Sequence, residues 1–298
     1  AQGNPTGLTT VTDADGRYCF LELRPGTYTV GEIQPDGYLD GLDSAGTEGG
    51  FAQNPGDMIM GVALKPGVNA DEYNFGELLP ASIGGQVRAR DGENCEVHLG
   101  ATPLSGVTVQ LLDAAGSIVA TTMTNADGRY MFEELLPGTY SVLEIQPEGY
   151  FEGEALAGSV GGQVLTTNLI SEIVLGNGTQ AVQYDFCEPP PATISGFVFQ
   201  DGPPIPVSDT SQPINVPDFR DGVLTPDDTM LPGVTLMLRD GVTGEPILGS
   251  IALVGTYPAD QPITTLTDSG GFYEFVGLPP GVYGVYEVAP EGYIRGID

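Results

Sequence analysis

The chain has 298 residues, and 40 acidic against 9 basic side chains give it a formal net charge of −31. This charge excludes binding to nucleic acid, or to an anionic membrane, through a basic surface, because both need clustered Lys and Arg. A single His excludes a His-rich zinc site, and no run of about 18 apolar residues is present for membrane insertion.

The composition is typical of a folded chain with many turns. Hydrophobic residues make up 40% of the sequence, and 44 Gly and 25 Pro residues separate short apolar runs. Such spacing predicts many short strands, and no segment shows helical periodicity. We therefore expect an all-β fold.

A motif of 27 residues occurs three times, at 12–38, 124–150 and 267–293. The first two copies are identical at 20 of 27 positions, and the third matches the second at 14. Self-similarity of this kind indicates tandem structural units. Only short, Pro-bearing linkers separate them, so we expect the units to form a semi-rigid rod.

The repeats divide the chain into three predicted domains. The second repeat, residues 80–190, is a complete unit. The first repeat, residues 1–79, lacks the first strands of such a unit, and the third repeat, residues 191–298, lacks the last strands. This pattern favours an excerpt of a longer array. The alternative is a fibre whose subunits complete each other by strand exchange.

Alternating polarity predicts the strands of the second repeat. Val107, Val109 and Leu111 fall on one face of a strand, and Tyr130 and Phe132 share a face of a later strand. The Asn-Ala-Asp-Gly and Pro-Gly sequences near these strands are turn formers. Short strands at this spacing indicate an antiparallel β-sandwich of Ig-like architecture.

The run TDADGxYxF…LxPGTYxVxEIQPxGY, with the closing sequence Tyr73-Asn-Phe-Gly-Glu77, resembles a known family. It is similar to the serine-aspartate-repeat (Sdr-type) B domains of the collagen-adhesin B-type superfamily of bacterial surface proteins. The resemblance implies a prealbumin-like, Ig-like sandwich and repeats that act as stalks on the cell surface. It also implies calcium, which many Sdr-type copies bind.

The third repeat contains the strongest candidate calcium site, a long acidic loop. Calcium takes 6–8 oxygen ligands, and carboxylates at both ends of a Gly-containing loop can supply them. The loop also resembles the Asp-rich calcium loop of the family. The alternative is a solvated acidic loop. The candidate ligands are Asp201, Asp218, Asp221, Asp227 and Asp228.

Two weaker candidates lie earlier in the chain. Asp91 and Glu93 occupy the equivalent, shorter loop of the second repeat. Asp40 and Asp43 follow the Gly-Tyr motif of the first repeat, where a plain acidic turn is the alternative. The Asp13-Ala-Asp15-Gly sequence is expected to be a hairpin turn only, because turns favour Asp and Gly.

Glu32, Glu144 and Glu287 occupy one position of the repeated motif. Each shares a strand face with Tyr and Val, and a carboxylate that faces a core needs a partner or a raised pKa. We expect these side chains to cap backbone N–H groups of the Pro-x-Gly-Tyr turn that follows.

This position resembles that of a glutamate in the collagen-adhesin B-type superfamily, where the glutamate promotes a self-formed Lys–Asn or Lys–Asp isopeptide bond. Asn74 and Asp185 stand where the resemblance places the acceptor. The only lysine, Lys65, lies in a turn nine residues before Asn74. We therefore expect no isopeptide bond in the second repeat.

The three cysteines leave two pairings open. Cys95 and Cys187 lie in the second repeat, where they form either a disulfide or two thiols, since spacing does not establish proximity. Cys19 lies between Tyr18 and Phe20, which are expected to point inward. It is therefore expected to face outward as a free thiol or an intermolecular bridge.

Together these features predict a structural repeat region of a secreted bacterial surface protein or extracellular fibre, stiffened by Ca²⁺. Its partners are expected to be neighbouring repeats of the same or identical chains, including a homopolymer. The alternatives are an adhesin module that binds a protein or glycan ligand, and accessory repeats of a large secreted enzyme. The sequence contains no phosphate-binding Gly loop or nucleophile elbow, so we expect no catalysis.

Overall fold

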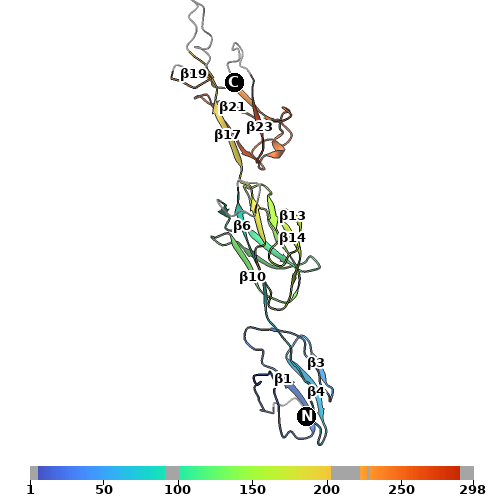
Figure 1. Cartoon of the computed structure of the whole chain (residues 1–298). Helices are drawn as coiled ribbons and strands as arrows, with labels where there is room; N and C mark the ends of the chain where they lie inside the picture. The colour runs from blue at the N-terminus through green and yellow to red at the C-terminus, as the bar shows by residue number, and fades with distance from the viewer. Residues whose placement is uncertain (1–5, 91–94, 96–100, 203–221, 227, 289–298) are drawn as a thin grey trace, which may run out of the picture.

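The computed structural model describes residues 6–90, 95, 101–202, 222–226 and 228–288. Within these residues the chain consists of strands, turns and one short 3-10 helix. Figure 1 shows three β-rich regions that follow one another along an elongated molecule. No helix of the described part is long and apolar enough to cross a membrane. The expected all-β fold is confirmed.

The second repeat is a sandwich of two sheets. One sheet has the order β10-β6-β16-β12, with β7 and β15 also pairing with β6, and the other has the order β13-β14-β11-β8-β9. The strands are β6 (Ala81–Ala89), β7 (Thr102–Pro103), β8 (Thr108–Leu112), β9 (Ile118–Met123), β10 (Arg129–Leu135), β11 (Gly138–Glu144), β12 (Glu154–Leu156), β13 (Gln163–Thr166), β14 (Leu169–Leu175), β15 (Gln180–Ala181) and β16 (Asp185–Glu188).

Most strand pairs are antiparallel, as expected, but β6 pairs in parallel with both β15 and β16. The first and last strands of the repeat therefore run side by side in the same direction. Because parallel neighbours need a long connection, this pairing joins residues about 100 positions apart. It brings the beginning and the end of the repeat into one sheet.

Alternating apolar side chains fill the space between the two sheets. Val109 and Leu111 of β8 are fully buried, and Val142 of β11 lies beside them in the same core. Tyr130 and Phe132 of β10 are buried from the opposite sheet, as expected from their spacing. Burial of this apolar area contributes on the order of 25 cal/mol per Å² to stability.

The first repeat shows fewer paired strands. Its sheets have the orders β1-β4-β3 and β2-β5, around a core of Ile59, Val62 and Tyr73. The strands are β1 (Gly26–Gly31), β2 (Leu39–Asp40), β3 (Phe51–Gln53), β4 (Met58–Leu64) and β5 (Glu77–Leu78).

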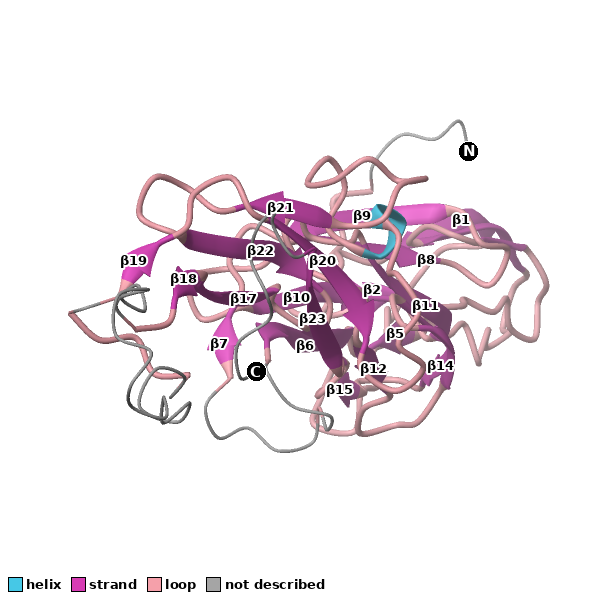
Figure 2. Cartoon of the chain, turned by 90° about the horizontal axis from the view of Figure 1, so that it is seen from above, coloured by secondary structure: helices cyan, strands magenta, loops and turns pink. Residues whose placement is uncertain are grey.

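The third repeat pairs β17 with β22, β18 with β19, and β20 with both β21 and β23. Its core includes Leu238, Ile263 and Phe275, all fully buried. The view in Figure 2 shows the 3-10 helix as a single short turn among strands. The elements are β17 (Ala192–Phe197), β18 (Phe199–Gln200), β19 (Thr229–Met230), β20 (Thr235–Asp240), η2 (Gly249–Ile251), β21 (Thr264–Leu266), β22 (Phe272–Leu278) and β23 (Tyr283–Val288).

One hairpin turn recurs in all three repeats. Asp13 Oδ1 accepts hydrogen bonds from the backbone N–H groups of Asp15 and Arg17, both at 2.9 Å. Asn125 and Asp268 make the same pair of contacts in the later repeats. The interpretation of the first Asp-Ala-Asp-Gly sequence as a hairpin turn is therefore confirmed, because its first carboxylate is used by the turn itself.

Candidate functional site

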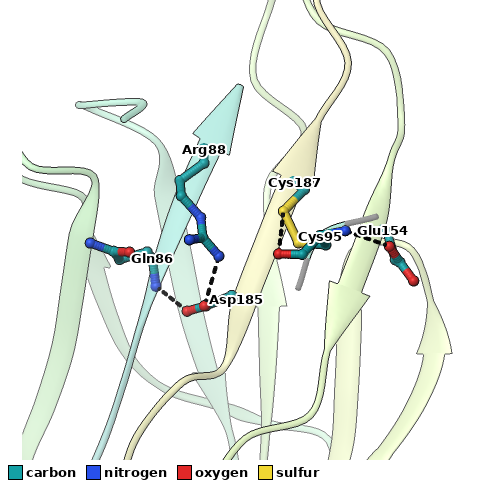
Figure 3. The surroundings of a disulfide bond; sticks show 6 residues. All are labelled: Gln86, Arg88, Cys95, Glu154, Asp185 and Cys187. Atoms are coloured by element: carbon teal, nitrogen blue, oxygen red, sulfur yellow. Dashed lines mark hydrogen bonds and ion pairs between the residues drawn. A yellow bond between two sulfur atoms is a disulfide. The ribbon is translucent and has the colours of Figure 1, made fainter. Parts of the chain in front are cut away.

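A buried ion pair joins the first and last strands of the second repeat. Arg88 on β6 and Asp185 on β16 lie 2.8 Å apart, and both side chains are less than a tenth exposed. The other Asp185 oxygen accepts the backbone N–H of Gln86 at 2.8 Å (Figure 3). Removing one partner of such a pair leaves an uncompensated buried charge, so the pair locks the β6–β16 contact.

The same strand end carries a disulfide between Cys95 and Cys187, with a Cα–Cα distance of 5.8 Å. Glu154 accepts the backbone N–H of Cys95 at 3.1 Å, and Figure 3 shows the bond beside the ion pair. Of the two alternatives left open for Cys95 and Cys187, the structure has the disulfide. Cys19 is exposed and free, which agrees with its expected outward position.

Two glutamates from opposite sheets meet at the end of the sandwich. Glu144 closes β11 and Glu188 closes β16, and they are 1% and 0% exposed. Burial, followed by the charge of Glu188, raises the pKa of Glu144 to about 9, and burial also raises the pKa of Glu188. Gln146 donates to Glu188 Oε2 at 2.5 Å.

The expectation that Glu144 caps the following turn is wrong. Both of its carboxyl oxygens are buried without a backbone donor. The carboxyl group instead faces the Glu188 carboxyl. Glu144 is the last residue of β11, and its side chain is 1% exposed.

The first repeat contains a related cluster of carboxyl groups. Gln34 Nε2 donates to Glu77 Oε2, which repeats the contact of Gln146 with Glu188. Burial, then the charges of Glu77, Asp43 and Asp57, raises the pKa of Glu32 to about 7.

Asp40 and Asp43, two predicted calcium ligands, border this cluster. Asp43 is 8% exposed, and its Oδ1 accepts the Gly76 N–H at 3.3 Å while Oδ2 has no hydrogen-bond partner. Asp40 Oδ2 accepts the Gly56 N–H at 2.6 Å, and Oδ1 is likewise buried without a partner. Burial raises the pKa of Asp43 above its usual range, and the Gly76 hydrogen bond partly opposes this.

The other calcium predictions are only partly within the described residues. Asp201 Oδ2 accepts the N–H of Gly222 at 3.1 Å, and Asp228 accepts the N–H groups of Gly202 and Thr225 at 2.7 and 2.6 Å. These hydrogen bonds lower the pKa of Asp228. The predicted ligands outside the described residues are Asp91, Glu93, Asp218, Asp221 and Asp227.

Across the described segments, no three side chains of the His, Cys, Asp and Glu types are already placed to hold one metal ion. A calcium ion would therefore have to draw additional carboxylates or carbonyl oxygens toward Asp40 and Asp43. Their two unpartnered buried oxygens fit such an ion chemically, because hard divalent cations prefer oxygen ligands.

Sequence reasoning missed Arg88, Glu188 and the Gln146 contact. One signal was present, since Glu77 and Glu188 occupy the same position of the repeated closing sequence. Asp185, which stands at the position of the isopeptide acceptor, forms an ion pair with Arg88. Lys65 lies 3.5 Å from Glu48 on the surface of the first repeat.

The chain is similar to a known domain family and to two curated proteins. The family described as SdrD B-like domain matches residues 81–186. Serine-aspartate repeat-containing protein F of Staphylococcus epidermidis is 27% identical over 95% of the chain, which spans 14% of that protein. Serine-aspartate repeat-containing protein D of Staphylococcus aureus (strain Newman) is 26% identical over 96% of the chain, which spans 19% of that protein.

Two solved structures align over most of the chain at low similarity. A streptococcal ancillary pilin has 15% identity and a TM-score of 0.33, covering 93% of this chain and 72% of the pilin. The Bacillus anthracis TIE protein has 17% identity and a TM-score of 0.33, covering 96% of this chain and 40% of that protein.

The chain spans less than a fifth of the length of these two curated relatives. A disulfide within the repeat is typical of proteins that fold in an oxidising compartment. Residues 81–186 therefore match the SdrD B-like domain family, and the chain is similar to staphylococcal serine-aspartate repeat-containing proteins over most of its length.

Proposed function

We propose that the chain acts as an extracellular spacer that keeps its length under load and is stiffened by calcium. Its partners are the neighbouring repeats of the same array, and the proposal gives it no catalytic role. The unpartnered buried oxygens of Asp40 and Asp43 are the single observation that carries the calcium part.

These oxygens support calcium binding for an energetic reason. A buried carboxylate without a hydrogen-bond donor loses its hydration without compensation, which costs at least about 1–3 kcal/mol for each group. Asp57 adds further negative charge to the same region. A divalent cation would remove both the desolvation penalty and the repulsion, and would tie β2 to the segments around it.

The load-bearing part of the proposal depends on the second repeat. The Arg88–Asp185 pair and the Cys95–Cys187 bond both join the beginning of this repeat to its end. A pulling force on an array enters a repeat at these two ends. Cross-connection there opposes separation of β6 from β16, so the repeat keeps its length.

The test is a calcium titration of the full chain, followed by calorimetry and small-angle scattering. We expect Asp43→Asn to remove one binding step and to lower the thermal stability gained from calcium. Asp36→Asn, an exposed acidic position in the neighbouring turn, is the control with the same change of charge. Unchanged melting temperature and unchanged particle dimensions between calcium and excess chelator would contradict the calcium part.

A further inference from the structure

The end of the second repeat contains two carboxyl groups that face each other across the two sheets. Glu144 belongs to the five-stranded sheet and Glu188 to the six-stranded sheet. Glu188 is also the last residue before the proline-rich linker, and the Pro189 carbonyl accepts the N–H of Phe151 at 3.0 Å. The pair therefore lies where the sandwich closes and the linker to the third repeat begins.

The carboxyl oxygens of the pair differ in whether the rest of the chain supplies them with a hydrogen-bond donor. Glu188 Oε2 accepts from Gln146, which is itself held by Asn168 Nδ2 at 3.2 Å. Glu188 Oε1 and both Glu144 oxygens are buried without a hydrogen-bond donor from the rest of the chain. Two ionised carboxylates in this position would repel each other at low effective dielectric, whereas one retained proton gives them a hydrogen bond.

Several titratable and charged groups lie around the pair. Glu152 adds negative charge near Glu188. Tyr130 on β10 interacts electrostatically with both Asp185 and Glu144, and Asp185 is paired with Arg88. Arg90, at the end of β6, donates its backbone N–H to the Glu188 carbonyl at 3.0 Å.

The first repeat provides an independent occurrence of the same arrangement. Glu32 and Glu77 occupy the equivalent positions, they interact, and Gln34 donates to Glu77 as Gln146 does to Glu188. The contact between carboxyl groups therefore belongs to the repeat design and is not confined to one copy.

We propose that Glu144 and Glu188 form a proton-dependent latch that holds the two sheets together while the pair keeps one shared proton. Loss of this proton loosens the end of the repeat next to the linker. The latch binds a proton rather than a metal ion, so it is separate from the calcium site proposed at Asp40 and Asp43.

The expected pH dependence has a definite sign. A carboxyl group with a raised pKa binds more protons in the folded state than in the unfolded state, so its stabilising effect is complete in acid and is lost as pH rises. For Glu144 the relevant window runs from its ordinary value of 4.5 to about 9. Within it, the opening equilibrium constant of the repeat rises by up to about tenfold for each pH unit.

The experiment measures hydrogen exchange of β11 and β16 amides in the full chain between pH 5 and 9, in excess chelator. Glu144→Gln supplies a permanent amide donor to Glu188. We expect this variant to lose the pH dependence and to exceed the parent in protection at pH 9. Glu188→Gln is the second variant, and Glu133→Gln on the exposed face of β10 is the control that retains the dependence of the parent.

Two results would overturn the proposal. One is the same pH dependence in the parent and in both variants. The other is a gain of protection in the parent on addition of calcium alone, at fixed pH, that is absent from Glu144→Gln. That second result would assign the pair to a metal ion and not to a shared proton.

Discussion

The first and second repeats use one sequence motif in two different surroundings. In the second repeat, Glu144 and Glu188 are enclosed between two sheets and stand beside an ion pair and a disulfide. In the first repeat, Glu32 and Glu77 are only partly buried and share their region with other acidic side chains. Because the motif is shared, the surroundings set how far burial raises the pKa of its carboxyl group, to about 9 for Glu144 and to about 7 for Glu32.

The largest expected effect comes from comparing a buried ion pair with an exposed one. Asp185→Asn keeps the shape of the side chain but removes the carboxylate charge that is paired with the buried Arg88, which is expected to cost about 3–5 kcal/mol. Glu48→Gln breaks the exposed pair with Lys65 and is expected to cost less than about 1 kcal/mol. Native-state hydrogen exchange of each repeat gives both values, and equal losses would contradict the assigned role of burial.

The disulfide comes next in size. Its closed loop spans a sequence separation of 92, so replacing both Cys95 and Cys187 by Ser is expected to lower the free energy of unfolding of the second repeat by about 2–4 kcal/mol. The first repeat should not change, because its thiol is free. Cys19→Ser is the control, and a comparable loss in that variant would contradict the assignment.

A smaller effect distinguishes the pH responses of the two repeats. Burial raises the pKa of Glu32 to about 7, so its stabilising effect is lost between pH 4.5 and about 7 as pH rises. Protection of β1 and β4 should fall over this window and then level off, whereas protection in the second repeat continues to fall toward pH 9. Because Glu32 is partly exposed, its slope should be well below the limit of about tenfold per pH unit. Identical profiles for the two repeats would remove the distinction.

The smallest effect concerns a backbone position shared by the repeats. Glu22 and Glu134 have a φ of 56°, in the left-handed region, and the equivalent position in the third repeat is Gly277. A residue with a Cβ atom pays roughly 1 kcal/mol for this conformation. Glu134→Gly should therefore be more stable than Glu134→Ala by about that amount in thermal unfolding. Equal stability of the two variants would contradict this explanation.

Sequence reasoning identified what local patterns and internal repetition encode. The strand faces of Val109 and Tyr130 followed from alternation, and the Cys95–Cys187 pairing was one of two open alternatives. Glu144 stood out because a carboxylate repeats on an apolar face. Its partner Glu188 could not be found in this way, because their contact depends on how two sheets are stacked. All the calcium ligands stay a prediction, both those within the described residues (Asp40, Asp43, Asp201 and Asp228) and those outside them (Asp91, Glu93, Asp218, Asp221 and Asp227).

The burial of Arg88 also could not be predicted from the local sequence pattern. It lies between Val87 and Ala89 on β6, so a charged residue at this point suggests a solvent-facing position. The parallel pairing of β6 with β16 buries it instead, opposite Asp185. Long-range pairing of this kind leaves no local signal in the sequence.

The most direct test of the spacer is to pull on the full chain in an optical trap, with and without a reductant. The account predicts that the second repeat, when its disulfide is intact, yields only the short segments outside the Cys95–Cys187 loop. Reduction should add an extension of roughly 300 Å, from a separation of 92 residues at about 3.3–3.6 Å each. It should also lower the force at which this repeat opens. Equal extensions and equal forces in both conditions would contradict a spacer whose length is held by cross-connection of the two ends of this repeat.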